Sequence, residues 1–229
     1  MERIETGTKE MNNFERLEHL IGKEKLSKLK GSKVAVIGLG GVGGICALTL
    51  ARSGIGTLVI QDFDVVTETN INRQVIAYYD TIGKNKAELI AEEIRRINPD
   101  CQLTVSTEKF NSESRLFEIP FDFLIDCIDS VPDKYLLITE CLKRSIPFVS
   151  SMGAAKKLDL KKLAIMDLSE TAYDPLAKAI RKKLREAQIY GPVMVVSSTE
   201  APASIDRLGS YMPVTATAGI MLADYAIKQ

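Results

Sequence analysis

Short apolar runs alternate with amphipathic stretches along the first two thirds of the chain. Five runs have the length and composition of buried strands: 33–37, 57–61, 103–107, 121–126 and 147–150. Two stretches between them, 45–53 and 84–97, carry apolar residues at helical spacing. Strands that alternate with helices are typical of a parallel sheet with helices on both faces. The pattern predicts an α/β fold with a Rossmann-like, doubly wound and mainly parallel sheet.

The rhythm changes after residue 152. The expected elements there are strands at 163–166 and 193–196, a helix beginning at Asp174-Pro175, and a final packed helix at 214–227. We interpret this part as a C-terminal antiparallel extension of the same sheet. A helix is predicted at 14–29, after a polar leader at 1–13. We therefore expect a single domain, 14–229, that includes its C-terminal extension.

Composition narrows the class of protein. The 30 basic residues balance the 30 acidic ones, so the molecule as a whole does not attract nucleic acid, and any such affinity needs a local patch. No apolar run approaches the length of a membrane span, and the polar N-terminus lacks the apolar core of a signal peptide. We expect a cytoplasmic protein without a membrane partner.

Cysteine and histidine do not suggest catalysis. The four cysteines, Cys46, Cys101, Cys127 and Cys141, lie in apolar segments and are expected to be buried thiols. No CxxC pair is present, which argues against a zinc knuckle. The single histidine, His19, lies on an amphipathic stretch and is expected at the surface or an interface.

A glycine-rich turn follows the first strand. Gly38, Gly40 and Gly43, with Gly41 between them, form G-x-G-x-x-G between a strand and a helix, where the backbone can approach a phosphate. Asp62 ends the second strand, at the position from which a carboxylate accepts hydrogen bonds from a ribose. Up to this point NAD and ATP fit equally well.

Further polar residues distinguish the two nucleotides. They are Asp64, Asn70, Asn72, Arg73, Gln74, Lys86 and Asp129. Singly, each has an ordinary alternative, such as a surface ion pair for Arg73 or a helix cap for Asp129. Hydride transfer does not need an arginine, a lysine and a metal-type carboxylate around a pyrophosphate, whereas a reaction that expels pyrophosphate uses all three to stabilise the leaving group. The set favours ATP chemistry.

In combination these motifs resemble the superfamily of ubiquitin-activating enzymes and of the bacterial adenylyltransferases of molybdopterin and thiamine synthesis. The resemblance runs from about Phe14 to the C-terminus. It implies that Asp62 holds the ribose, that Arg73 and Lys86 contact the phosphates, and that Asp129 binds Mg²⁺. It also implies a homodimer in which an arginine before the first strand, matched by Arg16, reaches into the partner's site.

The stretch from Asp126 to Lys134 indicates which branch this chain resembles. It contains I-D-S-V-x-x-K, a pattern of the bacterial tRNA threonylcarbamoyladenosine dehydratases. Ubiquitin-type and sulfur-carrier activators usually have asparagine after the magnesium aspartate and often have zinc-binding CxxC pairs, and this chain has neither. The resemblance implies ATP-dependent ring closure on tRNA, with a sulfur-transfer protein as a further possible partner. It implies that no cysteine nucleophile is required.

The helix expected after Asp174 carries the candidate tRNA contacts Lys178, Arg181, Lys182 and Arg185 on the face opposite its apolar residues. Nine basic residues against four acidic ones between 156 and 185 make this a local positive patch on a neutral protein, although a merely solvated face gives the same pattern. Two other functions stay open: adenylylation of the C-terminal carboxylate of a sulfur-carrier or ubiquitin-like protein, and a NAD-binding oxidoreductase or nucleotide sensor.

Overall fold

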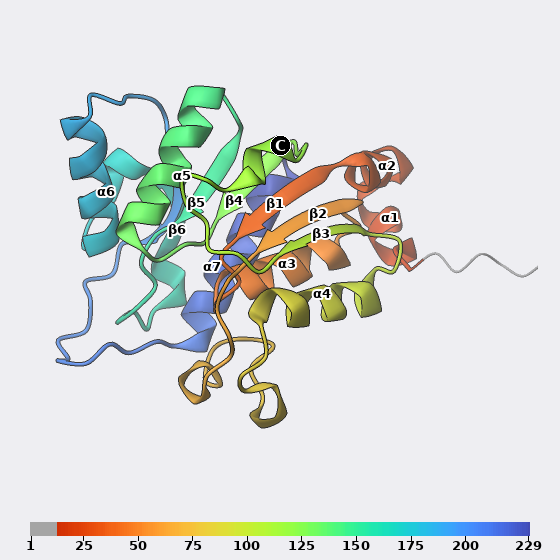
Figure 1. Cartoon of the computed structure of the whole chain (residues 1–229), viewed down its shortest axis with the longest axis horizontal. Coiled ribbons are helices and arrows are strands. Elements are labelled where there is room, and N and C mark those ends of the chain that lie inside the picture. The colour runs from red at the N-terminus through yellow and green to blue at the C-terminus, as the bar shows by residue number, and fades with distance from the viewer. Residues whose placement is uncertain (1–12) are drawn as a thin grey trace, which may run out of the picture.

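The computed structural model describes residues 13–229, which form one seven-stranded sheet in the order β3-β2-β1-β4-β5-β7-β6 (Figure 1). The strands are β1 (Lys33–Ile37), β2 (Thr57–Gln61), β3 (Gln102–Ser106), β4 (Phe123–Asp126), β5 (Phe148–Ser151), β6 (Leu163–Asp167) and β7 (Met194–Ser198). Neighbouring strands are parallel except β6, which is antiparallel to β7. The predicted doubly wound sheet and its antiparallel extension are confirmed.

Helices cover both faces of the sheet. They are α1 (Glu15–Ile21), α2 (Lys23–Gly31), α3 (Gly43–Arg52), α4 (Lys86–Ile97), α5 (Val131–Arg144), α6 (Pro175–Glu186) and α7 (Met212–Ile227). On one face α3 packs between α4 and α7, and on the other α5 packs against α6 (Figure 1). One large apolar cluster lies beneath the first layer, and two smaller clusters lie beneath the second. The central strands are therefore buried on both sides, which is why they consist of apolar runs.

The predicted N-terminal helix at 14–29 is wrong in one respect. Gly22 adopts φ +85, which interrupts the helix and divides it into α1 and α2. The polar leader lies outside the described residues except for Asn13. Within 13–229, no helix is long and apolar enough to cross a membrane.

Helix starts follow their capping residues. The side chain of Asn85 accepts hydrogen bonds from the backbone N–H groups of Ala87 and Glu88, so α4 begins at Lys86 and not at the predicted residue 84. Asp174 caps α6 in the same way, and Pro175 occupies the first helical position. The cap of α4 thereby fixes Lys86 at the edge of the sheet where β1 and β2 end.

The winding of the sheet reverses between β1 and β4. From β1 the chain proceeds to β2 and β3 on one side, whereas β4 leads to β5 on the other. In open parallel sheets of this kind, ligands bind in the crevice outside the carboxyl ends of the strands at this reversal. The fold therefore places a binding crevice beyond Ile37 and Asp126.

Candidate nucleotide-binding site

A pocket of about 750 Å³ occupies that crevice. Ten of the residues predicted from the sequence line it: Gly38, Gly40, Gly41, Asp62, Asp64, Asn70, Arg73, Gln74, Lys86 and Asp129. Of the other predicted residues, Gly43 begins α3 behind the pocket, and Asn72 donates from Nδ2 to the carbonyl oxygen of Ser210 at 3.0 Å. The fold thus brings together residues from five separate segments of the sequence.

Glycine is required at two positions of the turn by close backbone approaches. Gly38 has φ +87, and a β carbon there would lie 2.8 Å from the carbonyl oxygen of Cys127. A β carbon on Gly43 would lie 1.8 Å from the carbonyl oxygen of Gly38. Gly40 borders the pocket, with Nε2 of Gln74 as the nearest atom to its would-be β carbon, at 3.7 Å. The turn therefore packs tightly against Cys127, just after β4, while Gly40 and Gly41 line the pocket immediately before α3, where an anion can approach the backbone.

Asp62 connects this turn to the end of β2. Its carboxylate accepts the backbone N–H of Leu39 at 2.6 Å and that of Asp64 at 2.8 Å. Burial raises the pKa of Asp62, while these two N–H groups and Lys86 oppose that rise. Each carboxylate oxygen has a second lone pair, so Asp62 retains acceptor capacity for a ribose hydroxyl.

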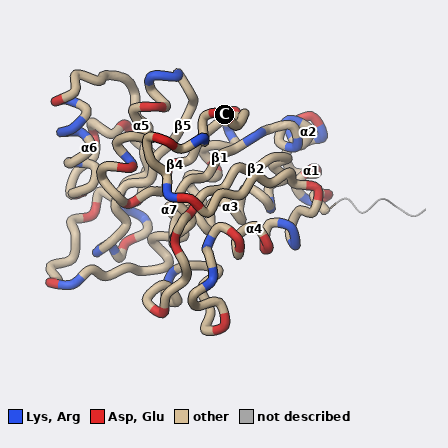
Figure 2. The backbone as a smooth tube through the Cα atoms, viewed as in Figure 1, with Lys and Arg blue, Asp and Glu red and all other residues tan. Residues whose placement is uncertain are grey.

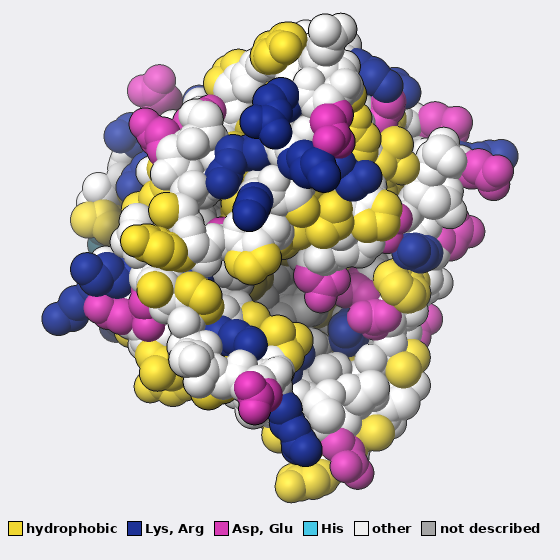
Figure 3. Space-filling model, turned by 90° about the vertical axis from the view of Figure 1, so that its left-hand side faces the viewer, with side chains coloured by type: hydrophobic (Ala, Val, Ile, Leu, Met, Phe, Trp, Pro, Cys, Tyr) yellow, Lys and Arg dark blue, Asp and Glu magenta, His cyan; other side chains and the backbone are white. Residues whose placement is uncertain are grey.

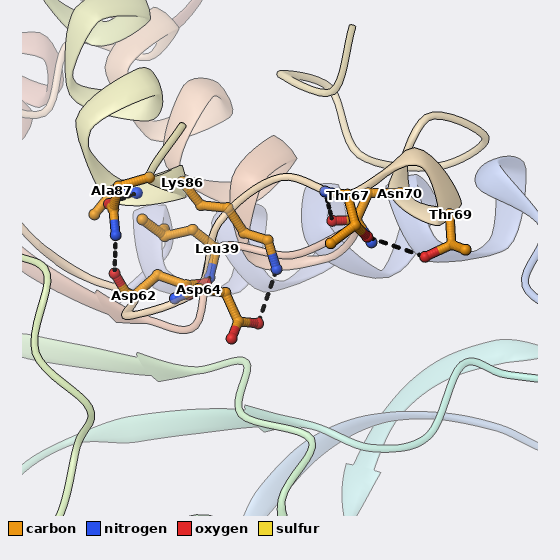
Figure 4. A network of polar contacts seen from close by, with 9 residues as sticks. Leu39, Asp62, Asp64, Thr67, Thr69, Asn70, Lys86 and Ala87 are labelled. Atoms are coloured by element: carbon orange, nitrogen blue, oxygen red, sulfur yellow. Dashed lines mark hydrogen bonds and ion pairs between the residues drawn. The ribbon is translucent and has the colours of Figure 1, made fainter. Parts of the chain in front are cut away.

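Lys86 and Asp64 form an ion pair at the wall of the pocket (Figure 4). Nζ of Lys86 lies 2.9 Å from Oδ2 of Asp64, and their side chains are 7% and 50% exposed. An ammonium group has three donors, so this one partner orients Lys86 without exhausting its capacity. The sequence assigned both residues to the nucleotide, and the structure additionally shows that Asp64 holds Lys86 in place.

Arg73 lies on the loop between β2 and α4. Its Nη1 donates to the carbonyl oxygen of Thr69 at 2.7 Å and to Oδ1 of Asn72 at 3.0 Å. The side chain of Asn70 accepts the N–H of Thr67, which stabilises the turn that supports Arg73 (Figure 4). Two of the five guanidinium donors therefore orient the side chain, and the planar fork that suits a phosphate borders the pocket.

Gln74 provides a test of whether the pocket fits a polar ligand. It is 6% exposed and lines the pocket, and within 13–229 its Oε1 atom has no hydrogen-bond partner. A buried acceptor without a partner is unfavourable by about 1–3 kcal/mol. A ligand that donates a hydrogen bond would satisfy it, as an adenosine can through its amino or hydroxyl groups.

Asp126 and Asp129, three positions apart at and after the end of β4, have different environments. Asp126 is fully buried, and its Oδ2 atom lies 2.7 Å from Nζ of Lys134 and 2.6 Å from Oγ of Ser150. Asp129 is exposed and lines the pocket. Asp126 therefore anchors the end of β4 through buried contacts, whereas Asp129 is open to a ligand.

The donors around Asp129 fit magnesium only together with a nucleotide. Within 13–229, no group of three or more His, Cys, Asp or Glu side chains could hold a metal ion. Mg²⁺ commonly takes one or two carboxylates together with substrate phosphates and water, instead of a cage made only of protein atoms. Asp129, exposed at the wall of the pocket, agrees with that arrangement.

Sequence reasoning missed one half of the pocket. We call it the distal half, and it consists of 151–157, 173–176, Pro202, Leu208 and Ser210. The buried Lys157 joins its segments, since Nζ donates to the carbonyl oxygens of Tyr173 and Glu200. The small residues that follow β5 were the available signal, because β5 ends at the same edge of the sheet as β1 and β4.

The basic helix α6 differs from the prediction at Arg181. Lys178, Lys182 and Arg185 are exposed, but Arg181 is half-buried and donates from Nη1 to the carbonyl oxygens of Leu168 and Thr171. The prediction that Arg181 shares the exposed face of α6 with the other three cations is therefore wrong in part, because this side chain also ties α6 to the segment after β6. A contact between Arg181 and tRNA stays a prediction. Basic positions recur along α6 in Figure 2, and Figure 3 shows Lys and Arg side chains gathered beside a hollow on this side of the molecule.

Arg16 is exposed on α1, at the opposite end of the sheet, and does not border the pocket of its own chain (Figure 1). His19 is exposed, as expected.

Three of the four cysteines are buried as predicted, whereas Cys127 is half-buried and lines the pocket. Burial, with Asp126 nearby, raises the pKa of the Cys127 thiol well above its usual range, so it remains protonated and a poor nucleophile.

Comparisons with known proteins agree with this geometry. The model of the ThiF family matches residues 14–229. A tRNA threonylcarbamoyladenosine dehydratase of Bacillus subtilis is 44% identical, covering 84% of this chain and 76% of the relative, and that of Escherichia coli is 34% identical, covering 92% and 90%. Crystal structures of the E. coli enzyme with ATP and with AMP superpose with a TM-score of 0.90 and 36% identity, covering 94% of this chain and 92% of theirs.

Proposed function

This chain belongs to the ThiF family and, within it, to the tRNA threonylcarbamoyladenosine dehydratases, and we propose that it catalyses ATP-dependent dehydration of threonylcarbamoyladenosine in tRNA. The observation that carries the proposal is the similarity, over 94% of the chain, to a dehydratase solved with ATP. The phosphate-type turn, Lys86 and Arg73 converge on one pocket, which supports the same conclusion.

The proposed reaction has two steps. First, a carboxylate oxygen of the threonyl group attacks the α-phosphorus of ATP, and pyrophosphate leaves. Second, an atom of the ureido group attacks the activated carbonyl carbon, AMP departs with the former carboxylate oxygen, and a proton is released. The nucleophiles of both steps belong to the substrate, so the protein contributes orientation and charge stabilisation. The proposed reaction therefore assigns no role to Cys127.

The phosphates are assigned to the glycine turn, Lys86 and Arg73. Negative charge accumulates on the bridging oxygen as pyrophosphate leaves. Lys86, held by Asp64, and Arg73, held by the carbonyl oxygen of Thr69, are already oriented and can stabilise that charge without moving. Asp62 is assigned to the ribose. Gln74, with its unsatisfied Oε1 atom, is assigned to a donor group of the nucleoside.

Magnesium is proposed at Asp129. A divalent ion between this carboxylate and the phosphates would neutralise charge on the triphosphate and orient it. Asp126 and Lys134 contribute by holding the end of β4, from which the loop with Asp129 departs.

Arg16 is proposed to act in a homodimer. Helix α1 lies far from the pocket of its own chain, so Arg16 could contact a nucleotide only in the pocket of a second copy.

Lys178, Lys182 and Arg185 are proposed to bind tRNA phosphates, with Arg181 supporting the helix from beneath. A sulfur-transfer protein is a further proposed partner, and the cytoplasm is the proposed location.

The release of pyrophosphate tests the proposed activity. We expect release when Mg²⁺ and ATP are mixed with tRNA from a strain that lacks the dehydratase, and none with a sulfur-carrier protein that ends in Gly-Gly. Release only with the carrier protein would contradict the proposal.

A further inference from the structure

Two residues of the distal half of the pocket have an unfavourable backbone conformation. Within 13–229, the non-glycine residues with positive φ are Ser145, Lys156, Tyr173 and Gln188. Ser145 and Gln188 follow the C-termini of α5 and α6, where left-handed residues commonly end helices. Lys156 and Tyr173, at φ 60 and 55, have no such explanation, and both line the pocket. Strain of this kind concentrates at functional sites.

The backbone around Tyr173 is held by buried charged groups. Nζ of Lys157, a residue only 2% exposed, donates to the carbonyl oxygen of Tyr173 at 3.1 Å. The next residue, Asp174, is 5% exposed and accepts the N–H groups of Gly153 at 2.8 Å and Ala177 at 3.0 Å. These bonds fix the backbone at Tyr173 and directly after it. The conformation of Tyr173 is therefore imposed by its surroundings and is not a feature of a loose loop.

The ring that this backbone presents is open to solvent. Tyr173 lines the pocket and is nonetheless 62% exposed, which places this residue at the mouth of the pocket. Helix α6 begins two residues later and carries the exposed cations Lys178, Lys182 and Arg185. Proteins bind unpaired RNA by combining aromatic rings, on which bases stack, with cations that contact the phosphates. The two parts of such a surface are adjacent here.

We propose that Tyr173 is a stacking platform for an unpaired base of the RNA substrate, at the mouth of the distal half, while the exposed cations of α6 contact neighbouring phosphates. The proposal rests on the proposed function, because an RNA must deliver the group that reacts with ATP. A ring on a rigidly held backbone loses less conformational freedom when a base stacks on it than a ring on a loose loop, which is a reason to retain the strained position.

Fluorescence gives a direct test, because the chain has no tryptophan. The Tyr173→Trp variant places a single reporter at the pocket mouth, and the Tyr79→Trp variant, at a position 84% exposed and outside the pocket lining, is its matched control. Titration with an anticodon stem-loop RNA that carries threonylcarbamoyladenosine is expected to quench the first variant and not the second. Quenching of neither variant, or of both equally, by an RNA that binds would overturn the proposal.

Kinetics give a second test. Tyr173→Ala keeps the β carbon, and with it the backbone strain, while removing the ring, so the KM for tRNA should rise about 5- to 150-fold. Tyr173→Phe should stay close to wild type, and Mg²⁺-ATP should raise the melting temperature of all three proteins equally. An unchanged KM, or an alanine variant that melts early and loses its ATP response, would overturn the proposal. Quenching by RNA without pyrophosphate release in the wild type would instead refute the proposed reaction and leave the stacking intact.

Discussion

The buried ion pair between Lys134 and Asp126 should contribute strongly to the stability of the fold. Both side chains are completely buried, and their charged atoms are 2.7 Å apart. Replacing Lys134 by Met removes the cation but leaves an uncompensated carboxylate in the core, which typically destabilises a protein by about 3–5 kcal/mol. For a domain of this size that corresponds to a fall in melting temperature of about 6–20 °C.

Lys143, on the same helix, is a control because it also forms an ion pair but is not buried. Lys143 of α5 pairs with Glu140 at 3.0 Å, but its side chain is 63% exposed, so Lys143→Met should change the stability by less than about 1 kcal/mol. Thermal and urea unfolding of both variants provide the measurement. Adding Asp126→Asn to Lys134→Met should recover part of the loss, because it removes the uncompensated charge. The amide oxygen can still accept the N–H of Ile128, which lies 3.0 Å from Oδ1 of Asp126 in the wild type. Equal losses at Lys134 and Lys143, or no recovery in the double variant, would refute this reasoning.

Three predictions concern the site and its partners. Asp129→Ala should slow pyrophosphate release at least about 100-fold without lowering the melting temperature, and retention of a tenth of the rate would remove Asp129 from the mechanism. Mixing Arg16→Ala chains with Asp129→Ala chains should restore activity if Arg16 acts across a homodimer, and proven subunit exchange without rescue would exclude that role. Changing Lys182 and Arg185 to Glu should raise the KM for tRNA and should reduce the slope of log affinity against log salt concentration by nearly two units. Arg181→Ala should mainly destabilise α6. Unchanged tRNA binding in the double variant would show that the tRNA contacts lie elsewhere.

The sheet and the part of the pocket around the glycine turn could be predicted because the sequence patterns that indicate them are local. A strand, a glycine turn and a helix start occupy consecutive residues, and the ends of parallel strands meet at one edge. The turn at Gly22 was missed because helical periodicity continues across it, and only the backbone conformation shows the break.

What could not be predicted depends on contacts between distant segments. The inward position of Arg181 follows from carbonyl groups at Leu168 and Thr171, which the spacing of charges along α6 does not reveal. The distal half is assembled by Lys157, whose partner Glu200 lies far along the chain. A lysine in a charged stretch gives no sign that it will be buried.

Mass analysis of tRNA nucleosides tests the central claim most directly. Bulk tRNA from a strain without this protein should be digested to nucleosides before and after incubation with the purified protein, Mg²⁺ and ATP. We predict that threonylcarbamoyladenosine loses the mass of one water molecule, that the change requires ATP, and that the Asp129→Ala protein does not produce it. A nucleoside that stays unchanged under conditions in which the protein binds ATP would contradict the account.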